Sequence, residues 1–241
     1  MSLRRARSVL IFTLLVALGV PAHATVTVIG DSADASIRSN GTISNGINAK
    51  RVGAGTSSPG AGSRAGVFVF QLPTPGPGEL PIVNSADFSL NVQTNYPNTL
   101  YSLDLYGLTA RAANTVLSDD NYFGPASAKH ATDTVLQAGF VPAGNTITGY
   151  MHPSADGDSA LANYLTNQYG ADGSGAGEWV FLRLNAATMP ASENTGIDVS
   201  MGEDTFASPL LSIALVPEPT AISLLGMLSL AACGSHRRRR R

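Results

Sequence analysis

Both ends of this chain are apolar segments flanked by arginines, so only the part between them is available to fold into a water-soluble domain. At the N-terminus a positive region precedes an apolar run and two alanines spaced as a cleavage site: Arg4, Arg5 and Arg7, then 9–20, then Ala22 and Ala24. This order is typical of a secretory signal peptide, here 1–24, which is delivered to the secretion translocon. Cleavage after Ala24 makes Thr25 the first residue of the exported protein.

The C-terminal segment, 216–241, holds three features in order. A polar motif comes first: Val216, Pro217, Glu218 and Pro219. Its prolines have a fixed φ and bias the residue before each of them toward extended backbone, which an enzyme can read as a strand-like peptide. An uncharged apolar stretch follows at 221–232, and a block of arginines comes last: Arg237, Arg238, Arg239, Arg240 and Arg241. Arginines next to a membrane helix favour the cytoplasmic side.

These three features resemble the PEP-CTERM sorting signal of exported bacterial proteins, which an exosortase processes at a Pro-Glu-Pro motif. The resemblance implies a single transmembrane sorting helix, transient insertion into the inner membrane, and delivery to the cell surface or the extracellular space. The alternative is an ordinary membrane anchor. As a helix, however, the apolar stretch is only about 18 Å long at ~1.5 Å per residue, shorter than the ~30 Å hydrocarbon core.

The part between the two ends is acidic and contains no cysteine. Three of the 15 basic residues belong to the signal peptide and five to the arginine block, which leaves seven against 16 acidic residues, a formal charge of −9. A nucleic-acid binder needs a basic patch, so nucleic acid is excluded as a partner. The one cysteine, Cys233, lies in the C-terminal segment, and the domain therefore has neither a disulfide nor thiol chemistry.

The body, 25–215, is expected to form one domain of short strands. The clearest strand is 84–92, in which Ala86, Phe88, Leu90 and Val92 alternate with Asp87, Ser89 and Asn91. Such alternation predicts an antiparallel strand with one buried face. Further strands are expected at 67–70, 103–105, 179–184 and 211–215, and glycine- and proline-rich loops at 53–62 and 73–78. Many short strands separated by such turns predict an all-β fold, an antiparallel β-sandwich or jelly roll.

One short helix interrupts the strands. Asp158 is suited to cap a helix over 159–168, and Gly170 is suited to end it. Leu161, Tyr164, Leu165 and Gln168 share one face of this helix. A helix of about ten residues is marginal by itself, so it is expected to lie across one end of the sandwich.

The order of the strand motifs carries a second resemblance. The motifs are Asp34-Ala35-Ser36-Ile37, Arg51-Val52-Gly53, Phe70-Gln71-Leu72-Pro73, the strand 83–90, and Ser208-Pro209-Leu210-Leu211-Ser212-Ile213. They resemble a DNRLRE-type domain, a jelly-roll module of bacterial surface proteins related to carbohydrate-binding modules. The resemblance covers about 25–215 and departs from the family pattern between Thr109 and Met151. It implies a fold more than a function.

Two acidic clusters are candidate calcium sites. Asp156 and Asp158 flank a glycine, and Asp119 and Asp120 precede Asn121. Calcium takes six to eight oxygen ligands from such loops, but neither cluster completes an EF-hand or a nonapeptide repeat. The alternative interpretation, solvated turns and a helix cap, is favoured, and no other cofactor is indicated.

Catalysis is not indicated by any local motif. The body contains two histidines, His130 and His152, and neither a G-x-S-x-G nor an H-E-x-x-H sequence. Tyr122 and Phe123 are candidate sugar-stacking side chains, although most aromatic residues pack in the core. We therefore expect a non-enzymatic surface or matrix protein, structural or adhesive. The alternatives are a carbohydrate-binding module for an exopolysaccharide and, more remotely, a polysaccharide hydrolase with two paired carboxylates.

Overall fold

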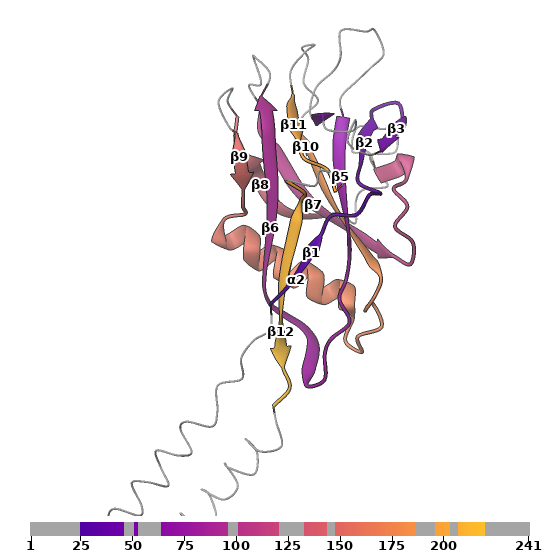
Figure 1. Cartoon of the computed structure of the whole chain (residues 1–241), viewed down its shortest axis with the longest axis vertical. Coiled ribbons are helices and arrows are strands. Elements are labelled where there is room, and N and C mark those ends of the chain that lie inside the picture. The colour runs from indigo at the N-terminus through magenta and orange to yellow at the C-terminus, as the bar shows by residue number, and fades with distance from the viewer. Residues whose placement is uncertain are drawn as a thin grey trace, which may run out of the picture.

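The computed structural model describes residues 25–45, 51–52, 64–95, 101–120, 133–143, 148–186, 196–202 and 207–219. They form two antiparallel sheets and one α-helix, which agrees with the β-sandwich that the sequence predicts (Figure 1). The expected signal peptide with Ala22 and Ala24, the apolar stretch 221–232 and the arginine block lie outside the described residues. Among the residues that are described, no helix is both long and apolar enough to cross a membrane.

The first sheet, here the β6 sheet, has the strand order β1-β12-β6-β11-β4, with β9 also paired to β6. Its strands are β1 (Thr25–Ile29), β4 (Arg51–Val52), β6 (Glu79–Asn95), β9 (Gly149–Met151), β11 (Ile197–Val199) and β12 (Leu210–Pro217). The second sheet, here the β10 sheet, has the order β3-β2-β5-β10-β7-β8. Its strands are β2 (Ala35–Arg38), β3 (Ile43–Asn45), β5 (Arg64–Gln71), β7 (Leu103–Arg111), β8 (Thr134–Val141) and β10 (Trp179–Ala186). The other elements are the 3-10 helix η2 (Ser118–Asp120) and the helix α2 (Ala155–Tyr169).

The main core lies between the two sheets and is centred on Phe88. This side chain is fully buried, and its ring lies 5.6 Å from that of Phe68, 6.0 Å from Phe70 and 5.7 Å from Phe140. The inward face predicted for β6 is confirmed, because its four alternating apolar side chains are all buried: Ala86, Phe88, Leu90 and Val92. Ser89, expected on the solvent face, is buried as well, since β12 pairs with β6 at this residue and β9 pairs with β6 directly beyond it.

The outer face of the β10 sheet is covered too. The expected strands 67–70 and 179–184 form β5 and β10 in the middle of this sheet. A second apolar cluster covers their outer side: Ala35, Ile37, Val67, Val69, Leu108, Val116 and Phe181. Asp104 of β7 is buried as well. Its carboxylate accepts hydrogen bonds from the backbone N–H of Gly139 (2.7 Å) and the hydroxyl of Tyr106 (3.3 Å), because the β7–β8 ladder shifts register there.

The helix α2 begins earlier than the sequence analysis expected. Ser154 is the N-cap, and its side chain accepts a hydrogen bond from the N–H of Gly157. Asp158 therefore lies in the first turn instead of capping it, which corrects the prediction. Gly170 does end the helix, with a φ of 71° that favours glycine.

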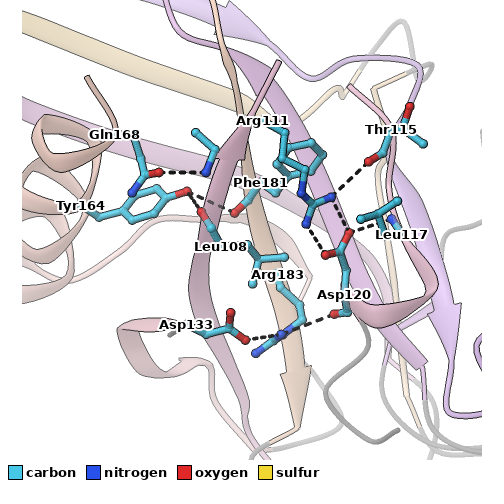
Figure 2. Close-up of polar contacts among 11 residues, drawn as sticks. Leu108, Arg111, Thr115, Leu117, Asp120, Asp133, Tyr164, Gln168, Phe181 and Arg183 are labelled. Atoms are coloured by element: carbon cyan, nitrogen blue, oxygen red, sulfur yellow. Dashed lines mark hydrogen bonds and ion pairs between the residues drawn. The ribbon is translucent and has the colours of Figure 1, made fainter. Parts of the chain in front are cut away.

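The helix runs across the strands, and its side chains bond β6 of one sheet and β7 of the other (Figure 1). Thr166 Oγ1 accepts a hydrogen bond from the N–H of Val83 in β6 (2.9 Å). In β7, Gln168 Oε1 accepts one from the N–H of Ala110 (2.8 Å), and the Tyr164 hydroxyl donates one to the carbonyl of Leu108 (Figure 2). The helix thus satisfies backbone groups of both sheets through its side chains.

Tyr164 needs a glycine opposite it. A Cβ atom at Gly107 in β7 would lie 2.5 Å from the Tyr164 ring. The hydroxyl of Tyr164 is buried, and burial raises its pKa well above the ordinary value of 10.0. The hydroxyl therefore stays protonated at neutral pH and can donate its hydrogen bond to Leu108.

Replacing Phe88 with alanine should lower the free energy of unfolding by roughly 3–5 kcal/mol, the usual cost of deleting a buried aromatic ring. Ile82, on the same strand but 44% exposed, is the matched control, and its alanine variant should cost about 0.5 kcal/mol or less. Urea unfolding curves measure both. Equal losses at the two positions would mean that the faces of β6 are assigned wrongly.

Candidate functional site

A polar groove lies on the outer face of the β6 sheet, beside the first half of α2. Its volume is about 340 Å³, and it is lined by Thr25, Asn84, Ser85, Ala86, Asp87, Asp158, Ser159, Ala162, Ser212 and Ala214. The sheet register explains this composition, because residues directly opposite one another point to the same face. Thr25, Ala214 and Ser85 form one row across β1, β12 and β6, and Thr27, Ser212 and Asp87 form the next.

The groove brings together two carboxylates that are far apart in the sequence. Asp87 comes from β6 and Asp158 from α2. Nδ1 of His152 lies 3.1 Å from both carboxylate oxygens of Asp87, and both side chains are about half exposed. Burial, and then the negative charge of Asp87, raise the pKa of Asp158, while His152 lowers it. Oδ1 of Asp158 is shielded from solvent and has no hydrogen-bond partner.

This arrangement can attract a cation, but it holds no activated nucleophile. His152 is the one histidine in the described ranges, and its ring nitrogen is bonded to Asp87 and not to a serine or cysteine. His130 lies outside those ranges. Sequence reasoning placed Asp87 on the solvent face of its strand but had no signal that would place Asp158 beside it.

The pair Asp156 and Asp158 does not form the glycine turn that a calcium site was expected to use. Both residues lie in the first turn of α2. Gly157 between them is buried and helical, and a Cβ atom there would lie 2.2 Å from Oε1 of Gln137. This glycine is therefore explained by packing. Asp158 faces the groove, whereas Asp156 is exposed and does not line it.

The second acidic pair lies in η2, where Asp120 is already paired. Its carboxylate accepts two hydrogen bonds from the guanidinium of Arg111, one of them at 2.9 Å, and one from the N–H of Leu117 at 2.8 Å (Figure 2). The guanidinium also lies 4.2 Å above the ring of Phe181. Asp119 is exposed. Tyr122 and Phe123, the candidate stacking residues, lie outside the described residues.

Sequence analysis missed a buried arginine on the outer face of the β10 sheet. Arg183 is fully buried, and it donates hydrogen bonds to Asn185 Oδ1 and Asp133 Oδ2, both at 2.7 Å. Figure 2 shows the bond to Asp133. Its guanidinium lies 4.7 Å above the ring of Tyr106. A charge inside an apolar strand requires buried partners, so the sequence 179–184 did carry a signal for such a network. The several hydrogen bonds of the Arg183 side chain indicate a structural role. They attach the residues on either side of 121–132 to the β10 sheet.

The remaining candidate is the sorting motif, which the structure describes up to Pro219. The last residue of β12, Pro217, pairs with Glu79 of β6, and the N–H of Glu218 donates a hydrogen bond to the carbonyl of Gly78 (2.7 Å). Val216 and Pro217 are half-buried, while Glu218 and Pro219 are exposed. β1 starts and β12 ends at the same end of the molecule, because the first residue of β1 pairs with Ala214 (Figure 1).

Comparison of the sequence with protein-family models and with curated proteins finds no match. The two resemblances therefore rest on the motifs themselves. Within the ranges that the structure covers, no three His, Cys, Asp or Glu side chains gather closely enough to hold a metal ion.

Calcium should not stabilise the body measurably. A ligand that binds only the folded state adds about 2.7 kcal/mol at 100 times its Kd, and for a domain of this size that would raise the Tm by about 5–10 °C. We expect Tm values in calcium and in EDTA to agree within about 1 °C, a shift well below that range. A rise of several degrees that disappears in Asp158→Ala, but not in the matched Asp156→Ala, would show that the groove is a calcium site.

Proposed function

We propose that the chain is an exported protein that an exosortase processes at Pro217-Glu218-Pro219, and that its sandwich acts at the cell surface or in the extracellular matrix without catalysing a reaction. The proposal includes a jelly-roll arrangement of the strands and a membrane-inserted precursor with a sorting helix at 221–232. The observation that carries it is the position of the motif. Glu218 and Pro219 are exposed and follow the last strand without an intervening linker.

The charges of the two ends favour one membrane topology. Insertion of an arginine at the centre of a bilayer costs roughly 2.5–3.5 kcal/mol even on the lenient insertion scale, so the block 237–241 is expected to stay in the cytoplasm. The body is expected to be translocated behind the signal peptide. The motif then lies at the outer face of the inner membrane, within reach of a membrane-embedded protease.

The fold suits attachment of the body to the membrane through the segment that follows β12. The hydrogen bond from Glu218 to Gly78 and the pairing of Pro217 with Glu79 join the start of the motif to β6, in the middle of its sheet. The exposed residues Glu218 and Pro219 are the part that a protease can read without opening the sheet. The core between the sheets is apolar and continuous. A structural or adhesive role is the simplest function for such a domain.

Replacing Pro217, Glu218 and Pro219 together with alanine should leave export intact and trap the protein as a membrane-bound, unprocessed form. The reason is that the change removes the recognition element while the apolar stretch and the arginine block remain. Cell fractionation with mass spectrometry of the C-terminus, in a host that carries exosortase, measures the outcome. Thermal unfolding of the variant body shows whether the end of β12 remains folded. Release of the variant with the wild-type C-terminus would mean that the motif is not recognised and that the segment is only an anchor.

A further inference from the structure

We propose that removal of the signal peptide controls processing at the sorting motif, because the two processing sites lie beside each other on neighbouring strands. Cleavage after Ala24 opens the edge of β12 along which the exosortase binds Pro217-Glu218-Pro219. The inference rests on the proposed function and adds an order to it. A chain that keeps its signal peptide, or any strand in the same place, is expected to keep its C-terminal segment.

The register between β1 and β12 is the first part of the argument. The two strands are antiparallel and pair without a shift over all five residues of β1, with Thr25 opposite Ala214. One residue back along β1 therefore corresponds to one residue forward along β12. By this count the end of the signal peptide, 22–24, passes the last residues of β12, 215–217. At about 3.3 Å per residue, the bond that is cleaved lies only about 10 Å from Pro217 along the strands.

The opposite edge of the motif is already occupied by the start of β6. Pro217 pairs with Glu79, and the N–H of Glu218 donates a hydrogen bond to the carbonyl of Gly78 (2.7 Å). The turn that supplies these partners is itself fixed. The N–H of Gly76 donates a hydrogen bond to Oε2 of Glu79 (2.8 Å), and the N–H of Glu79 donates one to the carbonyl of Gly76 (3.1 Å). A protein that adds a strand to the motif must therefore approach along the edge that faces β1.

This edge is where the signal peptide interferes with the second protease. Extended peptides are commonly recognised by strand addition, in which main-chain hydrogen bonds provide the affinity. Each residue has one main-chain donor and one main-chain carbonyl, so two strands cannot use the same edge at once. Before cleavage, the chain that continues from β1 runs along this edge. After cleavage, the chain begins at Thr25, opposite Ala214, and the part that passed 215–217 is gone.

The order of synthesis allows the signal peptide to be removed in time. It is the first part of the chain to reach the membrane, whereas β12 is the last described strand. Cleavage after Ala24 can therefore precede the pairing of β1 with β12. Where cleavage fails, the sheet closes with the signal peptide in place, and the motif is covered on both edges. The C-terminal segment then stays attached, so only chains with a finished N-terminus are released.

The direct test is a short strand, Thr-Val-Thr-Val, inserted between Ala24 and Thr25 of the full chain. It leaves the cleavage site intact and extends β1 past 215–217 with residues of the kind that β1 already contains. The matched control insert is Thr-Pro-Gly-Pro, which cannot continue the ladder because proline has no N–H. We expect motif processing to be about tenfold slower than wild type with the strand, the effect of one or two added hydrogen bonds, and within about twofold of wild type with the control.

Mass spectrometry of both termini over time, in a host that carries exosortase, measures these rates. Ala24→Gln provides a second variant, since the cleavage site requires a small residue. This variant should keep both its signal peptide and its C-terminal segment, whereas the small replacement Ala24→Ser should be processed at both ends. Equal processing rates for the two inserts would overturn the proposal. So would an Ala24→Gln chain that retains its signal peptide and still loses its C-terminal segment.

Hydrogen–deuterium exchange tests the geometry without the enzyme. The mature body, 25–219, contains both sheets and the whole described core. Extending its N-terminus by Thr-Val-Thr-Val should slow exchange of the Leu215 or Val216 amide, whichever points toward β1, and the proline-containing extension should not. Equal exchange with both extensions would contradict the register on which the proposal depends. If wild type is not processed at the motif, the proposed function fails and the order of processing fails with it, whereas the exchange result decides the register alone.

Discussion

The β6 sheet depends on the pairing of β12, the last described strand, with strands on both of its edges. One edge pairs with β1, the first described strand, and the other pairs with β6, the longest strand in the molecule. Three apolar side chains of β12 enter the core between the sheets: Leu211, Ile213 and Leu215. Without β12, β1 has no strand partner and the inner face of β6 loses part of its cover. The sheet can therefore close only when almost the whole body has been translated.

The side chains of α2 hold the two sheets together where strand pairing ends. Thr166 bonds β6, and Tyr164 and Gln168 bond β7. Gly107 leaves the space that the Tyr164 ring occupies. The same helix forms one wall of the groove, so the distance between Asp158 and Asp87 is set by contacts that α2 makes with its opposite face. A small polar site on the surface is thus positioned by the core.

Patterns that depend on neighbours in the sequence predicted the structure well. The alternation in β6 and the apolar runs of β5 and β10 were identified because burial of one face or both faces repeats with the period of a strand. The errors concern residues whose environment comes from distant segments. Ser89 is buried because β12 and β9 pair with β6 at and next to this residue, and Asp158 faces a strand that lies far from it in the sequence. The start of α2 was misplaced for a different reason, since Ser154 and Asp158 are both good caps and local propensity does not choose between them.

The central claim is that β12 is an integral strand that leads directly into the exposed residues Glu218 and Pro219. Hydrogen–deuterium exchange of the mature body measures this most directly. If the claim holds, the amides of Leu211, Ile213 and Leu215 that bond β1 or β6 exchange as slowly as those of β6 itself, and protection falls abruptly after Glu218. If β12 is instead a loosely attached tail, its amides exchange rapidly while β5, β6 and β10 remain protected, and that result would contradict the account.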